Sequence, residues 1–271
     1  MRYIIHYPTL AFRPFIDKLY ILSHDNCLTA PAELSSPANA FTAMVPNYGD
    51  RYRLHSDFSA GTLLPSSFLA GFSSRAYRLE LTGQVNMLGI VFRGIGLRAF
   101  FSSVNLGDLT DQRLDLSVVV SSDAHRLCDQ LAEAPTDATR FALVETYLLN
   151  RLRLINRTPT TADMAAHFML ENRGMLTMDG LADTVCVSPR HLRRLFTEQA
   201  GISPKFFAQL KRFNYVHFIL TRDAKAGWPD FLTTGGFYDQ SHLIRDFVEF
   251  TGKAPSVAVQ RFRKTIELVT E

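Results

Sequence analysis

The chain has 271 residues, of which 46% are hydrophobic and 20% are charged, a composition typical of a soluble globular protein of about two domains. It contains neither an apolar stretch suited to spanning a membrane nor a signal-peptide pattern, so we expect a cytoplasmic protein without a membrane partner. Cys27, Cys128 and Cys186 form no CxxC pair, which excludes a disulfide scaffold. His24 lies three residues before Cys27, but no nearby Cys or His pair supplies the further ligands of a zinc site, so we expect no metal and no cofactor.

The basic residues are concentrated in the last third of the chain. The net charge is +3, from 29 Lys and Arg against 26 Asp and Glu. Between residues 177 and 264 there are five Lys and eight Arg against eight acidic residues, an excess of +5, so the remainder carries −2. A partner with negative charge is therefore expected at the C-terminal part.

The first 120 residues have the pattern of short strands separated by turns. Residues 41–45, 77–81 and 87–92 are apolar or alternating runs, and Pro, Gly, Asn and Asp clusters separate them. This pattern predicts a small antiparallel β-barrel or sandwich with flanking helices, of which we take the barrel as the expected fold.

A helix is predicted from Asp137, because apolar side chains recur there at spacings of three and four residues. Its stripe supports two alternatives that the sequence leaves open: packing on the protein's own barrel, or forming the seam of a homodimer. The candidate dimerisation residues are Phe141, Val144, Leu148 and Leu152. Residues 156–161 have the composition of a linker, which divides the chain into a sensor or dimerisation domain, 1–157, and an all-helical domain, 158–271.

The C-terminal half contains an internal repeat with an offset of 51 residues. Each copy begins with an N-cap residue, Ser188 or Asp239, and ends with a glycine followed three residues later by a proline. The matching pairs are Ser188 and Asp239, His191 and His242, Leu192 and Leu243, Arg194 and Arg245, Phe196 and Phe247, Glu198 and Glu249, Gly201 and Gly252, and Pro204 and Pro255.

Each copy predicts a short helix with one apolar face and one polar face. In the first copy Leu192, Leu195 and Phe196 share the apolar side, and the outward residues are Arg190, Arg193 and Arg194. In the second copy the outward residues are Ser241, His242 and Arg245. No carboxylate lies among the three arginines, so we expect them to be unpaired and available to guanine edges and phosphates.

Further helices are predicted around the two copies. Residues 176–187, capped by Thr177, precede the first copy, and residues 228–238 take the same place before the second. A helix of about four turns begins at Pro204 and joins the two units. Two helices with a tight turn and a basic outer face are typical of a helix-turn-helix, and the joining helix suits two units spaced one DNA turn apart.

These residues resemble the AraC/XylS family of transcription regulators. The resemblance covers about residues 175–264 and rests on Leu181-Ala182, on 188–196 (SPRHLRRLF), on 201–204 (GISP), on 236–247 (GFYDQSHLIRDF), and on Thr251-Gly252 with Pro255. It implies a domain of two helix-turn-helix units that binds double-stranded DNA through the six outward residues named above. Leu232 departs from the small residue usual in the second unit, which puts the placement of that unit in question.

The N-terminal half resembles, more loosely, the β-barrel sensor domain of such regulators, through residues 44–46 with Gly49, 69–72 and 88–92. This resemblance implies a small-molecule effector or dimerisation. RNA polymerase is a further candidate partner of a regulator, and the sequence does not decide between activation and repression. His6, His24 and His55 do not form a cupin metal motif.

Three functions remain to be compared. The leading hypothesis is a sequence-specific DNA-binding transcription regulator, controlled by an effector or by dimerisation and not an enzyme, because no nucleophile elbow, P-loop or ligand cluster is present. The first alternative is a cupin-like ligand-binding or enzymatic barrel fused to a DNA-tethering domain. The second is a nonspecific architectural protein, for which an excess of +5 is small.

Overall fold

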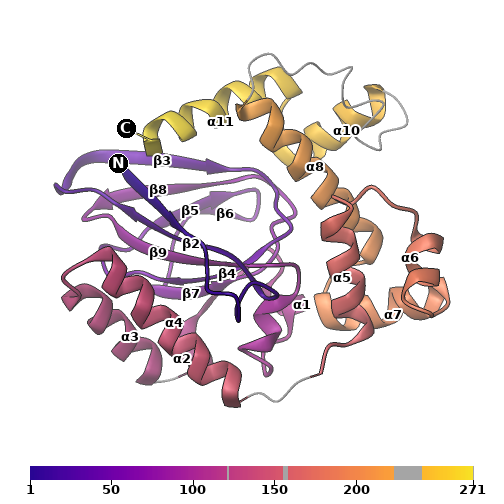
Figure 1. The fold of residues 1–271 in the computed structure, drawn as a ribbon. Helices are drawn as coiled ribbons and strands as arrows, with labels where there is room; N and C mark the ends of the chain where they lie inside the picture. Colours follow the sequence, from indigo (N-terminus) through magenta and orange to yellow (C-terminus); the bar gives the residue numbers. More distant parts are fainter. Residues whose placement is uncertain (121, 155–157, 223–239, 271) are drawn as a thin grey trace.

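The computed structural model describes residues 1–120, 122–154, 158–222 and 240–270. Within these residues, antiparallel strands form a six-stranded sheet in the order β1-β2-β9-β4-β7-β10 and a four-stranded sheet in the order β3-β8-β5-β6 (Figure 1). The strands are β1 (Arg2–His6), β2 (Ile16–Ser23), β3 (Leu28–Ser36), β4 (Thr42–Pro46), β5 (Arg53–Ser56), β6 (Ser59–Leu63), β7 (Ser67–Ala70), β8 (Tyr77–Gly83), β9 (Asn86–Phe92) and β10 (Arg113–Asp115).

The two sheets pack face to face around an apolar cluster to which both contribute, including Val45 and Met87 from the larger sheet and Leu54 and Leu81 from the smaller. The predicted strands at 41–45, 77–81 and 87–92 are confirmed as β4, β8 and β9. The expected antiparallel β domain is confirmed, but closure into a barrel is not detected, since no strand ladder joins the two sheets in the described part of the chain.

Helices α2 (Leu116–Val120), α3 (Ser122–Glu133) and α4 (Asp137–Leu154) lie along the six-stranded sheet (Figure 1). Strand β9 is buried on both faces for this reason: Met87 faces the other sheet, while Leu88 and Ile90 face the core that the helices share. This explains its almost unbroken apolar sequence.

The apolar stripe of α4 is part of this core. Phe141 is 5% exposed, Val144 and Leu148 are fully buried, and Leu152 is half-buried against the same cluster. The proposed dimer seam is therefore corrected: these side chains pack on the protein's own sheet, the first of the two alternatives, because the sheet face needs an apolar cover.

The rest of the chain is helical, as predicted. Its helices are α5 (Thr161–Glu171), α6 (Met178–Thr184), α7 (Pro189–Ala200), α8 (Pro204–Arg222), α10 (Gln240–Thr251) and α11 (Pro255–Thr270). The sequence of the N-terminal half also forms the short helices η1 (Gly96–Ala99) and α1 (Leu106–Leu109), which were not predicted. The predicted helix at 228–238, with Leu232, lies outside the described residues.

One apolar core runs through both halves of the molecule. It joins Ile90 and Phe92 of the sheet to Ala166 of α5 and Phe207 of α8. The predicted boundary between residues 157 and 158 falls at residues 155–157, which the structure does not describe. The two-domain division at that point stays a prediction.

Candidate nucleic-acid interface

The first helix-turn-helix unit consists of α6 and α7, and its caps form as predicted. The Thr177 hydroxyl accepts a hydrogen bond from the Gly180 amide at 3.1 Å, and the Ser188 hydroxyl accepts one from the His191 amide at 3.2 Å. Cys186, in the turn between the helices, has a φ of 57°. The cap and turn thus fix where α7 begins and how it leaves α6.

The two faces of α7 also agree with the sequence prediction. Leu192 and Phe196 are 1% and 0% exposed and pack in the core, whereas Arg190, Arg193 and Arg194 are exposed. No ion pair joins Arg190 or Arg193 to a residue that the structure describes. Two guanidinium groups are thus held on the outward face of a helix that cannot rotate without exposing its apolar side.

Arg194 differs from the expectation that all three arginines are unpaired. One of its terminal nitrogens lies 2.8 and 3.1 Å from the two carboxylate oxygens of Glu198, one turn along the helix. Both side chains are more than half exposed, so this pair contributes well below about 1 kcal/mol and a phosphate can displace Glu198. The spacing of four residues between Arg194 and Glu198 on one helix was the signal in the sequence for this pair.

In the second unit the structure describes α10 but not the helix expected before it. Ser241 and Arg245 are exposed, as predicted, and Leu243, Phe247 and Phe250 are buried. Nothing further is described for the side chain of His242. The second unit therefore presents at least two of its three predicted outward residues to solvent.

Asp246 anchors α10 and was not identified from the sequence. Its side chain is 2% exposed and accepts hydrogen bonds from Gln209 at 2.9 Å and from Arg212 at 3.2 Å, both on α8. A buried carboxylate with two such partners fixes α10 against α8. The sequence did carry a signal for Asp246, because it is an acidic residue on the apolar face of the predicted helix.

The joining helix α8 has 19 residues, which is about 28 Å at 1.5 Å per residue. Arg263 of α11 donates to the carbonyl oxygens of Leu220 and Thr221, at 2.6 and 3.3 Å, and so closes the C-terminal end of α8. Arg263 therefore has a structural role in the helical domain. The side chain of Arg261 is outside the described residues.

His217 lies on the buried face of α8 among the rings of Phe213, Phe247 and Phe262. Its Nε2 atom has no hydrogen-bond partner among the described residues. Burial lowers the pKa of His217 from 6.5 to about 4, since the cation would lose its hydration. His217 is therefore a neutral core residue at physiological pH.

The N-terminal half contacts both units directly. Arg98 of η1 donates to the side chain of Gln199 at the end of α7, and the Thr160 hydroxyl oxygen lies 2.8 Å from the same Gln199 oxygen. The ring of Phe207 packs against the rings of Phe72 in the N-terminal half and Phe196 of α7, with centroid distances of 5.7 and 5.5 Å. Helix α7 is thus held by polar and aromatic contacts that begin in the sensor-like half.

The joining helix α8 and the second unit also contact the N-terminal half. The side-chain Nδ2 atom of Asn214 donates to the Ala38 carbonyl at 2.7 Å, and its Oδ1 atom accepts from the Ala40 backbone amide at 3.1 Å. Arg75 donates to the carbonyl oxygen of Glu249 on α10, and α11 runs beside β3 (Figure 1). Sequence reasoning missed all of these, because each joins segments more than a hundred residues apart.

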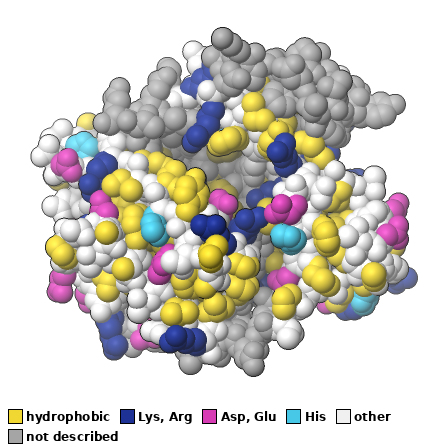
Figure 2. Space-filling view, in the orientation of Figure 1, with side chains coloured by type: hydrophobic (Ala, Val, Ile, Leu, Met, Phe, Trp, Pro, Cys, Tyr) yellow, Lys and Arg dark blue, Asp and Glu magenta, His cyan; other side chains and the backbone are white. Residues whose placement is uncertain are grey.

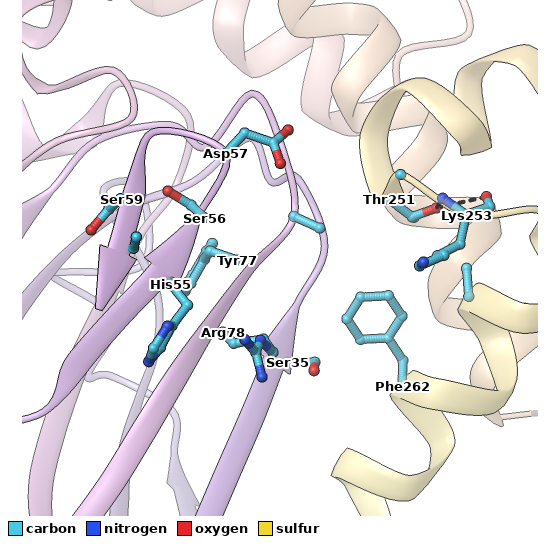
Figure 3. Close-up of a pocket in the computed structure, with 14 residues that line it drawn as sticks. Ser35, His55, Ser56, Asp57, Ser59, Tyr77, Arg78, Thr251, Lys253 and Phe262 are labelled. Atoms are coloured by element: carbon cyan, nitrogen blue, oxygen red, sulfur yellow. Dashed lines mark hydrogen bonds between the residues drawn. The ribbon is translucent and has the colours of Figure 1, made fainter. Parts of the chain in front are cut away.

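A pocket of about 480 Å³ lies where the β5–β6 hairpin and β8 face the junction of α10 and α11 (Figure 3). Figure 3 shows Phe262 and Lys253 on the helical wall and Asp57, Tyr77 and Arg78 on the strand wall. Several of its polar groups are already partnered: His55 contacts Glu80 at 2.7 Å, and Arg78 pairs with Glu33. It is a polar contact region between the halves.

Two family models match separate parts of the chain. Residues 5–115 match a domain of unknown function (DUF6597), and residues 181–261 match a helix-turn-helix domain. The second match spans α6, α7, α8 and α10, the elements that carry the outward arginines and the internal repeat.

The C-terminal part of the chain is a helix-turn-helix domain of the AraC type. This AraC-type protein is accordingly a DNA-binding transcription regulator, with an N-terminal antiparallel β-sheet domain and a C-terminal helical domain.

Solved structures of low identity are similar over most of this AraC-type chain. ToxT from Vibrio cholerae has 12% identity and a TM-score of 0.47, with 89% of this chain and 97% of that chain covered. ToxT from Vibrio cholerae O395 bound to (E)-4-(8-methylnaphthalen-1-yl)but-3-enoic acid has 11% identity and a TM-score of 0.46, with 89% and 97% covered.

The AraC-like transcriptional activator CuxR has 13% identity and a TM-score of 0.31, with 86% of this chain and 91% of that chain covered. No curated protein matches the chain. Among the described residues, no helix has the length and apolarity needed to cross a bilayer, and no group of three His, Cys, Asp or Glu is placed to hold a metal ion.

Proposed function

We propose that this regulator recognises its DNA site by base readout from α7, with Arg190 and Arg193 contacting base edges and Arg194 joining them when it leaves Glu198. The observation that carries this proposal is the pair of exposed guanidinium groups opposite the buried Leu192 and Phe196. A guanidinium in the major groove can donate to both O6 and N7 of one guanine and so distinguishes that base from others. A guanidinium that contacts only phosphates makes no such distinction.

The second unit reads a neighbouring segment of the same groove face through Ser241, His242 and Arg245. Support comes from the internal repeat, from the exposed Ser241 and Arg245, and from the length of α8 between the units. Asp246 contributes by holding α10 against α8 and makes no DNA contact itself, because its carboxylate is buried.

The N-terminal domain, for which we keep residues 1–157, controls this activity. Its contacts with Gln199 at the end of α7, with Asn214 on the joining helix α8 and with Glu249 on α10 link the domain to the elements that support both DNA-reading helices. A small-molecule effector supplies that change in our proposal. Dimerisation and contact with RNA polymerase remain predictions, and a dimer has to use a surface other than the buried stripe of α4.

The test begins with selection of bound sequences from random DNA by the full-length protein. Affinity for the selected site and its single-base variants is then measured for Arg193→Ala and for a matched control, Arg153→Ala, which removes an exposed arginine from α4. Losing a bidentate guanine contact costs about 1–3 kcal/mol at one base position. Arg193→Ala should therefore weaken the selected site and lose discrimination at one position, while Arg153→Ala changes neither.

Uniform weakening of all variants by Arg193→Ala would make α7 a phosphate anchor and would overturn the base-readout proposal. A protein that selects no sequence, with affinity falling steeply with salt for every DNA, would favour the architectural alternative. The enzymatic alternative would be favoured by turnover of a small substrate by the full-length chain in the absence of DNA.

A further inference from the structure

A crease separates the N-terminal domain from α5. It has a volume of about 760 Å³, within the range of about 300–1,000 Å³ that small-molecule sites occupy. One wall comes from the segment before β2 and the segment after β9, and the other from α5 with the end of α4. Both walls are mainly apolar: the first contributes Phe15 and Ile95, and the second contributes Leu152, Met164, Ala166 and Phe168.

Large apolar side chains are left exposed around this crease, and they come from both halves of the molecule. Leu10 of the N-terminal domain is 77% exposed, and Met164 and Phe168 of α5 are 43% and 36% exposed. Figure 2 shows apolar patches on this face beside the hollow between the two halves. An apolar occupant would cover side chains that are otherwise in contact with water.

The charged groups of the crease already have partners within the protein. Arg93 pairs with Glu171 across the crease at 2.9 Å, and Arg13 donates through Nε to the Pro8 carbonyl at 3.3 Å. Asp163 accepts hydrogen bonds from the Thr160 amide and hydroxyl, at 2.8 and 2.7 Å, in the cap of α5. Two arginines and two carboxylates leave the lining with no net charge, so it does not call for a charged ligand.

We propose that this crease binds an uncharged, largely apolar small molecule. Such a ligand would bury the exposed walls without breaking the Arg93–Glu171 pair, and it would hold α5 to the N-terminal domain. Because α5 packs against α7, the same ligand would change the affinity for DNA, and DNA would change the affinity for the ligand by the same factor. This regulatory consequence rests on the proposed function, whereas ligand binding itself does not.

The binding test uses the full-length protein and the uncharged fluorescent probe N-phenyl-1-naphthylamine. We expect saturable binding of one probe per chain, with the emission shift of an apolar environment. Met164→Asp and Phe168→Asp should each weaken binding by about tenfold or more, since an apolar ligand would desolvate the new carboxylate. Val257→Asp is the matched control, because Val257 is an apolar residue, 51% exposed, on α11 away from the crease, and it should leave binding unchanged.

Competition defines the ligand class. Dodecanol should displace the probe at concentrations at which dodecanoate, with the same chain length and a negative charge, does not. Equal or better displacement by dodecanoate would overturn the uncharged class. Probe binding that does not saturate, or that Met164→Asp and Phe168→Asp leave unchanged, would overturn the site itself.

Two further measurements keep the result interpretable. If Met164→Asp lowers thermal stability, Met164→Gln replaces it with the same expectation of weaker probe binding. Sedimentation of the parent protein tests a second copy as the occupant: a dimer that Met164→Asp dissociates, without any probe binding, would overturn the small-molecule proposal. A probe that binds without changing DNA affinity would leave the site intact and count against the proposed control of DNA binding.

Discussion

Gly201 at the end of α7 meets Gly107 of α1 backbone to backbone. A Cβ atom placed on Gly201 would lie 2.1 Å from the Cα atom of Gly107, so the DNA-reading helix and the N-terminal domain approach closely only because Gly201 lacks a side chain. Gly201 also has a φ of 75°, the left-handed conformation that ends the helix. The equivalent residue of the internal repeat, Gly252, has a φ of 66° and no atom within 4 Å of its Cβ position.

These two glycines predict different costs for the same substitution. Gly252→Ala should lower the free energy of unfolding by about 1–2 kcal/mol, the cost of a left-handed alanine alone. Gly201→Ala adds the clash with Gly107 and should destabilise the protein by more than that, with loss of protection from proteolysis at the junction of α1 and α7. Urea denaturation of the two variants checks this, and equal losses would show that the contact with Gly107 is unimportant.

The buried His217 predicts a loss of stability in acid. Its pKa is about 4 in the folded protein and 6.5 when unfolded, so between these values the unfolded chain binds a proton that the folded chain does not. The free energy of unfolding is therefore unaffected by His217 titration above pH 6.5 and decreases by about 3 kcal/mol as the pH falls to 4. His217→Gln should remove this part of the pH dependence in urea denaturation, whereas His191→Gln, at an exposed site, should not. Identical pH profiles for parent and His217→Gln would contradict the assignment.

The Arg212–Asp246 and Arg194–Glu198 ion pairs should differ in strength. Asp246→Ala removes the buried carboxylate that pairs with the partly buried Arg212 and should cost about 3–5 kcal/mol of unfolding free energy. Glu198→Ala removes the partner of exposed Arg194 and should cost less than about 1 kcal/mol. Thermal denaturation of both variants measures the difference. A small loss for Asp246→Ala would mean that α10 is held by its apolar side chains alone.

Leu148→Glu tests the assignment of the α4 stripe. Because Leu148 is fully buried against the protein's own sheet, a glutamate there should unfold the N-terminal domain or cost several kcal/mol, about the loss of a core leucine plus a buried charge. Circular dichroism and sedimentation separate this outcome from a change in assembly. If the parent protein were a dimer and Leu148→Glu gave a folded monomer, the stripe of α4 would be a dimer seam and its assignment to the protein's own core would be wrong.

Local features of the DNA-binding region could be predicted from the sequence. Thr177 and Ser188 marked two helix starts, Gly201 marked an end, and Leu192 and Phe196 defined which face of α7 is buried. These features depend on residues within one or two turns of each other, so spacing alone determines them. The internal repeat and the family resemblance followed from the same residues.

Contacts between distant segments were decided only by the tertiary structure. The stripe of α4 fits a dimer seam as well as it fits a sheet, and only the position of the six-stranded sheet shows which surface covers Val144 and Leu148. Spacing likewise cannot show that Asp246 meets Arg212, that Arg98 meets Gln199, or that Arg93 bridges to Glu171. The physical reason is that periodicity defines which face of an element is apolar, whereas the partner of that face depends on how the whole chain closes on itself.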